Sequence, residues 1–138
     1  MEWIEHRIKA NINRKKLTKV WEDTGIKDNV EFAILTNDIY KEWSGMTTSE
    51  YKTFKGIRKE NLRDNMTDIE VILTDLGEVA TRELVKEKKS SDLEENRKIS
   101  RLGGEVAKVA KNDLENKLNK SVISTSNKLK YKYDNKLD

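Results

Sequence analysis

Residues 67–88, with the sequence TDIEVILTDLGEVATRELVKEK, decide the fold class of this chain. Their apolar side chains recur at intervals of three and four positions, which places them on one face of an α-helix. Thr67 and Glu70 have the spacing of a capping box, in which each side chain accepts a hydrogen bond from the backbone N–H of the other residue. We therefore predict a helix over residues 67–88 at the centre of the core. Its core-facing residues are expected to be Ile69, Ile72, Leu73, Leu76, Val79, Ala80 and Leu84.

The same periodicity predicts two further long helices, near residues 2–24 and 92–118. In the first, an isoleucine recurs every four positions and Gly25 follows as a stop signal. In the second, Gly103 and Gly104 interrupt the pattern, although the apolar spacing continues through them nearly in phase. We interpret the paired glycines as a close helix crossing or a kink rather than as a helix end. The isoleucines of the first stripe are Ile4, Ile8 and Ile12.

Two brief helices are predicted between these long ones. Thr36 or Asn37 is expected to cap the first of them. Thr47 and Glu50 form a second capping box, which is expected to begin the other. Glycine follows each segment, as is usual where a helix ends. The glycines are Gly45 and Gly56, and the inward-facing aromatic residues of the second brief helix are expected to be Tyr51 and Phe54.

Together these patterns predict an all-α protein, a compact bundle of about five to six helices. Residues 1–124 are expected to form a single helical domain and residues 125–138 a basic, disordered tail, with room for a short docked helix after Lys120 before the tail frays. The tryptophans fall on apolar helical faces, so we expect them to anchor the core rather than stack on nucleic-acid bases. They are Trp3, Trp21 and Trp43.

Composition limits the function classes. The chain has 138 residues, no proline and no cysteine, and 38% of its residues are charged. The net charge of +3 supports a polyanion partner only weakly, so any such claim depends on local clusters. No window is apolar enough for a membrane span or a signal peptide, and the lack of cysteine fits a reducing compartment. We therefore expect a cytoplasmic protein without a membrane partner.

Catalytic machinery is missing from the sequence. His6 is the only histidine, so neither a histidine-based metal site nor a nucleophilic triad has its parts. The LGGE at residues 102–105 lacks the downstream Lys-Ser/Thr of a phosphate loop. We predict a protein that is not an enzyme and needs no cofactor or metal.

One basic cluster is a candidate contact surface. Four basic residues lie within nine positions, just before the N-terminus of the helix at 67–88, where free N–H groups and the helix dipole favour anions. This arrangement could bind phosphate. The alternative is a solvated junction in which Glu60 and Asp64 pair locally with the basic side chains. The four residues are Lys55, Arg58, Lys59 and Arg63.

A second candidate lies near the C-terminus, in the sequence KLKYKY. Interleaved lysine and tyrosine suit contact with phosphates and stacking on bases. A disordered tail that only adds charge accounts for the same composition equally well. The residues singled out are Lys128, Lys130, Tyr131 and Lys132.

Several short pieces, taken in order, resemble the C-terminal region of the DNA-damage-inducible protein D family, which is related to phage Bro-N antirepressor proteins. The resemblance covers roughly residues 2–124 and is strongest over residues 55–67. It depends on the order and spacing of weak pieces rather than on any one of them. These are Phe-Ala-Ile at 32–34, the segments 40–45, 55–59, 61–67 and 81–83, and the glycines at 103 and 104.

The resemblance implies a bacterial or phage-associated regulatory protein of the DNA-damage response whose usual N-terminal Bro-like domain is missing here. It implies as partner a host protein of DNA repair, recombination or defence, or the nucleic acid on which that protein acts; a phage-encoded inhibitor would fit as well. It supplies no catalytic residue. The alternative is a structural or oligomerisation domain, in which the helices at 2–24 and 67–88 pair between the chains of a homodimer.

Overall fold

The computed structural model describes residues 2–127, apart from the side chains of residues 2–4, 6, 7 and 10. This part of the chain is helical and contains no strand, which confirms the predicted all-α bundle. The three long helices lie within one residue of the predicted bounds. The elements are α1 (Glu2–Asp23), α2 (Asn29–Ser44), α3 (Thr48–Lys55), the 3-10 helix η1 (Arg63–Asn65), α4 (Asp68–Lys88) and α5 (Leu93–Leu118).

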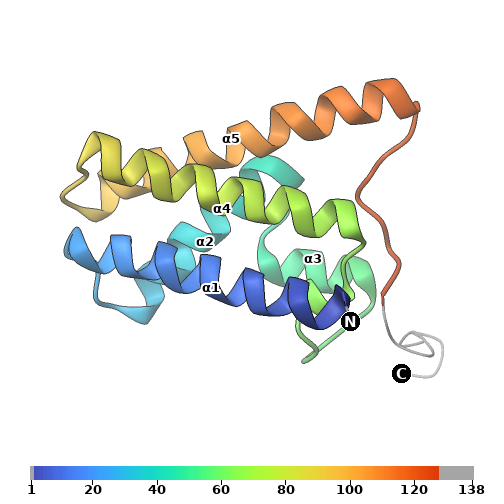
Figure 1. Cartoon of the computed structure of the whole chain (residues 1–138), viewed down its shortest axis with the longest axis horizontal. Helices are drawn as coiled ribbons and strands as arrows, with labels where there is room; N and C mark the ends of the chain where they lie inside the picture. The colour runs from blue at the N-terminus through green and yellow to red at the C-terminus, as the bar shows by residue number, and fades with distance from the viewer. Residues whose placement is uncertain (1, 128–138) are drawn as a thin grey trace.

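The helices pack as a bundle around α4. Figure 1 shows α1 and α4 side by side and running in the same direction, with α5 running back the opposite way. Helix α2 packs against both α4 and α5, and α3 continues from it through a short turn. Each long helix therefore has at least one helical neighbour that covers its inner face. None of the described helices has the length and apolar character needed to cross a membrane.

Helix α4 begins with the predicted capping box, since the side chains and backbone N–H groups of Thr67 and Glu70 are bonded reciprocally. Its inner face is more polar than the sequence predicts, because it buries two carboxylates and two threonines. Leu73 is buried as expected, but Ile72 is 57% exposed, so the expectation that Ile72 faces the core is wrong. The buried polar residues are Glu70, Thr74, Glu78 and Thr81.

Aromatic side chains pack in two groups: Trp21 of α1 lies against Phe32 of α2, and a cluster joins α2 to α3 through Tyr40, Trp43, Tyr51 and Phe54. Trp21 and Trp43 are fully or almost fully buried, as predicted, and Tyr51 lies edge-on to Tyr40 with ring centroids 6.3 Å apart. Phe54 was expected to point inward, but its side chain is 41% exposed. Helix α3 is only two turns long and turns its Tyr51 face to the core, which leaves Phe54 at the edge of the cluster. The side chain of Trp3 lies outside the described part.

The paired glycines mark a close helix crossing, and α5 continues through them without a break. A Cβ atom at Gly103 would lie 1.9 Å from the hydroxyl oxygen of Thr81 on α4, and one at Gly104 would lie 2.8 Å from the carbonyl oxygen of Ile39 on α2. Glycine therefore lets α5 approach both neighbouring backbones more closely than any side chain would allow. The interpretation as a close crossing is confirmed.

The structure corrects two expectations about helix ends and faces. Helix α2 is a single helix that begins at Asn29, with Asp28 as its N-cap: the Asp28 carboxylate accepts a 2.9 Å hydrogen bond from the backbone N–H of Val30. Neither Thr36 nor Asn37 caps a helix. In α1, Ile8 and Ile12 are 54% and 47% exposed, so that part of the isoleucine stripe does not enter the core.

After α5, the chain returns to α3 without regular secondary structure. Asn119 ends α5 with φ 58°, and residues 121–127 then run from the end of α5 toward α3 (Figure 1). Val122 is buried, and its backbone N–H donates a 3.0 Å hydrogen bond to the Glu115 carboxylate. We call residues 121–127 the C-terminal strap.

Candidate functional site

The four basic residues predicted around residues 55–63 do not form one surface. Lys55 is fully buried, and its ammonium lies 2.7 Å from the Glu70 carboxylate. It also donates to the carbonyl oxygens of Ser124 at 2.6 Å and Ser126 at 2.8 Å. With all three of its donors used inside the protein, Lys55 has no means of contacting a phosphate. The expectation that Lys55 belongs to a contact surface is therefore corrected.

Arg63 is turned inward as well. Its guanidinium pairs with Asp75 at 2.8 Å and with the almost completely buried carboxylate of Glu78. Arg14 of α1 reaches the other oxygen of Glu78 at 3.2 Å. Burial lowers the pKa of Arg63, but Glu78, Tyr40 and Asp75 together outweigh the effect of burial, so the net shift of this pKa is upward. Arg63 thus joins η1 to α4 as part of an internal polar network.

The remaining residues of that cluster lie on the turn between α3 and η1. Arg58 and Lys59 are exposed there. The backbone N–H of Arg58 donates a 2.8 Å hydrogen bond to the Glu60 carboxylate, so Glu60 organises the turn locally. The structure therefore separates the cluster into two inward-facing and two exposed side chains. The tail residues Lys128, Lys130, Tyr131 and Lys132 lie outside the described residues.

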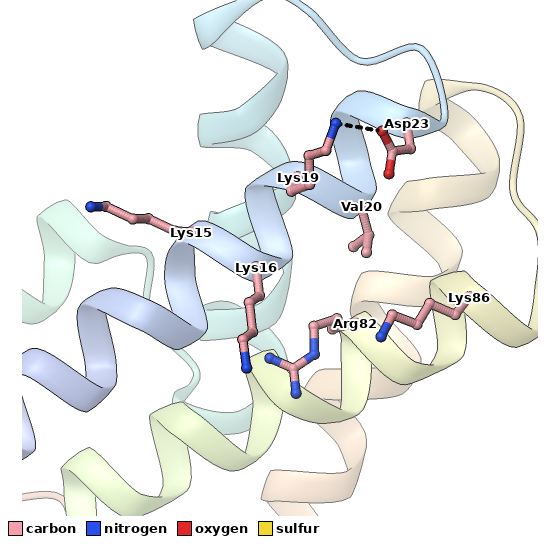
Figure 2. A pocket seen from close by; sticks show the side chains of 7 residues that line it. All are labelled: Lys15, Lys16, Lys19, Val20, Asp23, Arg82 and Lys86. Atoms are coloured by element: carbon pink, nitrogen blue, oxygen red, sulfur yellow. Dashed lines mark ion pairs between the residues drawn. The ribbon is translucent and has the colours of Figure 1, made fainter.

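A different group of basic side chains comes together between α1 and α4. Figure 2 shows a groove lined by Lys15, Lys16 and Lys19 from α1 and by Arg82 and Lys86 from α4. Its volume is about 560 Å³, and Val20 and Asp23 complete the lining. We call this the α1–α4 groove. Two helices that are far apart in the sequence thus contribute charges of the same sign to one cavity.

The groove carries an excess of positive charge. Five basic side chains line it against one carboxylate, Asp23, and that carboxylate pairs with Lys19 at 3.1 Å. The hydrogen bond from Lys19 to Asp23 and their attraction raise the pKa of Lys19, which keeps it charged. Lys15 and Lys16 make no ion pair with another described residue. Glu83, which is not part of the lining, lies 3.4 Å from Arg82 and 3.6 Å from Lys86. The charge that no described acid pairs with is therefore that of Lys15 and Lys16.

Arg82 is the least exposed cation of the groove, with 14% of its side chain accessible. Its Nε lies 3.4 Å from the carboxylate of the neighbouring Glu83, but its Nη1 has no hydrogen-bond partner among the described residues. Figure 2 shows the Lys16 ammonium extending from the opposite helix toward the same space. An anion placed between these two side chains would neutralise both charges, although the Nη1 of Arg82 itself is buried.

Sequence reasoning missed this groove because its two halves are 67 residues apart, counting from Lys15 to Arg82. Within each half, the spacing places two basic residues on the same face of a helix: Lys15 and Lys19 are four positions apart, as are Arg82 and Lys86. Recognising the site requires knowing that α1 lies beside α4, which the periodicity of either helix does not reveal.

Among the side chains that the structure describes, no group of three or more histidine, cysteine, aspartate or glutamate residues comes together to hold a metal ion. The titratable groups that are buried are instead paired with one another, as in the Lys55–Glu70 pair. Comparison with known proteins gives no relative from which a role could be transferred. No family model matches the chain, and neither a curated protein nor a solved structure is significantly similar to it.

Proposed function

We propose that this chain is a non-enzymatic binding module whose α1–α4 groove holds the phosphates of a nucleic acid. One observation carries the proposal: five basic side chains from two helices line one groove that contains a single, already paired carboxylate. Protein surfaces usually intersperse charges of both signs. A groove lined by one sign concentrates the potential and attracts ligands of the opposite charge.

The chemistry of the lining favours a phosphate backbone. Four of the five cations are lysines, which act as flexible point charges, and three of these lie on two successive turns of α1. Residues four positions apart on a helix are separated by about 6 Å along its axis, so Lys15 and Lys19 start about one turn apart on α1. Lysines spaced along a helix contact phosphates without reading base sequence.

The regulatory part of the proposal draws on the resemblance to the DNA-damage-inducible protein D family. In that context, the module would act in the cytoplasm on a nucleic acid that an enzyme of DNA repair, recombination or defence uses as its substrate. By binding this nucleic acid, it would regulate the enzyme. The groove needs no catalytic residue for such a role. Because the binding is electrostatic, it should not discriminate strongly among DNA sequences.

The test is fluorescence anisotropy of labelled single- and double-stranded DNA at two salt concentrations. The groove variant combines Lys15→Gln, Lys16→Gln and Lys86→Gln. The matched control combines Lys98→Gln, Lys108→Gln and Lys120→Gln, which remove the same charge from positions outside the groove. We expect the groove variant to lose about tenfold or more in affinity and to have a salt slope smaller by about one for each lost phosphate contact.

Two results would contradict the proposal. Equal losses in both variants would mean that only net charge matters and that the groove is not the site. No binding of the unchanged chain to either DNA at low salt would mean that the groove serves another anionic partner, such as an acidic protein surface. Circular dichroism of both variants, checked first, ensures that each retains its helices.

A structural role is a second candidate, because α5 exposes an apolar stripe. Leu102, Val106 and Val109 are 42%, 43% and 61% exposed and share one face of the helix. The helices at 2–24 and 67–88, which the sequence allowed to pair between chains, pack against each other within this chain. Light scattering across a dilution series tests the idea: a monomer at all concentrations would remove oligomerisation as the function.

A further inference from the structure

The C-terminal strap is held to the bundle through its backbone. The Lys55 ammonium donates to the carbonyl oxygens of Ser124 and Ser126 at 2.6 and 2.8 Å. The backbone N–H of Ser124 lies 3.4 Å from the Glu70 carboxylate, to which it donates. Two side chains of the bundle thus recognise two carbonyl groups and one N–H group of an extended segment. These are groups that almost every residue of a polypeptide carries.

Only a few side chains of the strap contribute to this contact. Val122 is the only one that is buried, with 7% of its surface exposed, and Ile123 is partly buried. Thr125 and Ser126 are exposed. The amide of Asn127 donates a 2.8 Å hydrogen bond to the carbonyl oxygen of Lys55. The contact therefore depends on the extended backbone, on one branched apolar residue two positions before Ser124, and on one amide three positions after it. Another segment with the same backbone path and similar residues at those two positions would make the same contacts.

Stability alone gives no reason for a lysine at residue 55. Lys55 and Glu70 both have fully buried side chains, and replacing such a pair by apolar residues is often neutral or stabilising. An ammonium has three donors, and Glu70 accepts only one of them. The other two need acceptors, which the strap supplies as carbonyl oxygens. The arrangement therefore suits recognition of a peptide backbone more closely than it suits core packing.

The strap is connected in a way that would let it leave without unwinding a helix. It has no regular secondary structure, and it follows the end of α5 at Asn119, whose left-handed backbone reverses the chain direction. As an attached segment, it competes for its site at an effective concentration in the millimolar range. A free segment must therefore reach a concentration in that range to displace the strap, or the binding of the strap to the bundle must first be weakened.

We propose that Lys55 and Glu70 form a binding site for an extended segment of a second polypeptide, and that the strap occupies this site as an internal competitor. The partner segment carries a β-branched apolar residue two positions before a residue whose backbone N–H and C=O bind Glu70 and Lys55. Two small residues and a residue with a side-chain amide follow, as in the strap. This site is separate from the α1–α4 groove, so the proposal does not depend on whether the groove binds nucleic acid.

The test uses the full-length chain and a fluorescent reporter on the strap. The chain has no cysteine, so Thr125→Cys gives a single attachment point for an environment-sensitive dye at an exposed position. The probe is a synthetic peptide with the sequence SVISTSN of residues 121–127 and blocked ends. We expect a saturable change in dye emission with half-saturation in the millimolar range, as the peptide replaces the strap.

A second variant and a control peptide make the result specific. Val122→Ala in the labelled chain weakens the internal competitor but leaves the peptide unchanged, so half-saturation should fall on the order of tenfold. A peptide with Ser124→Pro lacks the N–H that Glu70 accepts and should cause no change. The proposal is overturned if the labelled parent chain does not respond to the parent peptide, or if both peptides act equally.

Discussion

The ammonium of Lys55 lies 2.7 Å from the carboxylate of Glu70, and neither side chain has any exposed surface. The same carboxylate accepts hydrogen bonds from the hydroxyl of Tyr51 and from the backbone N–H of Thr67. Burial and the Glu70 carboxylate both raise the pKa of Tyr51, so this hydroxyl keeps its proton and remains a donor. One buried carboxylate therefore joins α3 and the start of α4, and its Lys55 partner extends the connection to the strap.

Breaking this pair should be costly. We expect Lys55→Met to lower the free energy of unfolding by about 3–5 kcal/mol, because it leaves the Glu70 charge buried with no cation beside it. Urea denaturation followed by circular dichroism measures the change. A loss below about 1 kcal/mol would contradict the view that Lys55 is an internal partner of Glu70 rather than a surface cation.

The double variant separates lost charge from lost packing. Glu70→Gln keeps an oxygen for the Thr67 N–H but removes the negative charge. In Lys55→Met/Glu70→Gln no charge remains buried, so the double variant should lose clearly less stability than the sum of the two single variants. Additive losses would mean that the two charges do not interact.

The sequence predicted most of the fold because its signals are local. The capping boxes at Thr47 and Thr67 and the apolar spacing of α4 depend only on residues within a few positions of each other. The start of α2 was missed because Asp28 precedes a segment that reads as a short apolar run. The glycine crossing could be predicted because the apolar spacing of α5 stays in phase through Gly103 and Gly104, which favours a continuous helix approached closely by its neighbours.

The candidate sites were much less predictable. Charge in the sequence does not tell whether a lysine points outward, and Lys55 became internal because Glu70, 15 residues away, supplies its counterion. The α1–α4 groove exists only because two distant helices are neighbours. The strap contact likewise joins Lys55 to Ser124 across 69 residues. Pairings of this kind depend on tertiary packing, which no local pattern encodes.

The close crossing of α4 and α5 gives a further prediction. Gly103→Ala should destabilise the protein by about 1–3 kcal/mol, because the added methyl group would meet the hydroxyl oxygen and backbone of Thr81. Alanine is otherwise the better helix former by about 1 kcal/mol. Asn112→Ala, at an exposed position of the same helix, is the matched control and should not destabilise. Thermal unfolding of both variants measures the difference, and equal melting temperatures would argue against a tight crossing.

The capping box of α3 should make stability depend on pH. The backbone N–H of Thr47 donates to the Glu50 carboxylate and lowers its pKa below the ordinary value of 4.5. A group with a lowered folded-state pKa adds stability above its unfolded-state pKa, and this is lost as the pH falls through the folded-state value. Glu50→Gln should therefore melt below the parent chain at neutral pH, and the difference should shrink well below pH 4.5. A difference that does not change with pH would exclude a contribution from the ionised carboxylate.

The basic residues around residues 55–63 should separate into two classes by their effect on stability. Arg63→Met leaves Glu78 and Asp75 without their shared cation in a largely buried network, so we expect a loss of about 3 kcal/mol in the free energy of unfolding. The matched control, Arg58→Gln with Lys59→Gln, changes two exposed side chains and should stay within about 0.5 kcal/mol of the parent. Urea denaturation of both variants measures the contrast. Similar small losses in both variants would place Arg63 on the surface with Arg58 and Lys59, and the whole cluster would again be a candidate contact surface. The expected contrast assigns Arg63 to the interior, so that only the turn with Arg58 and Lys59 is available to a partner.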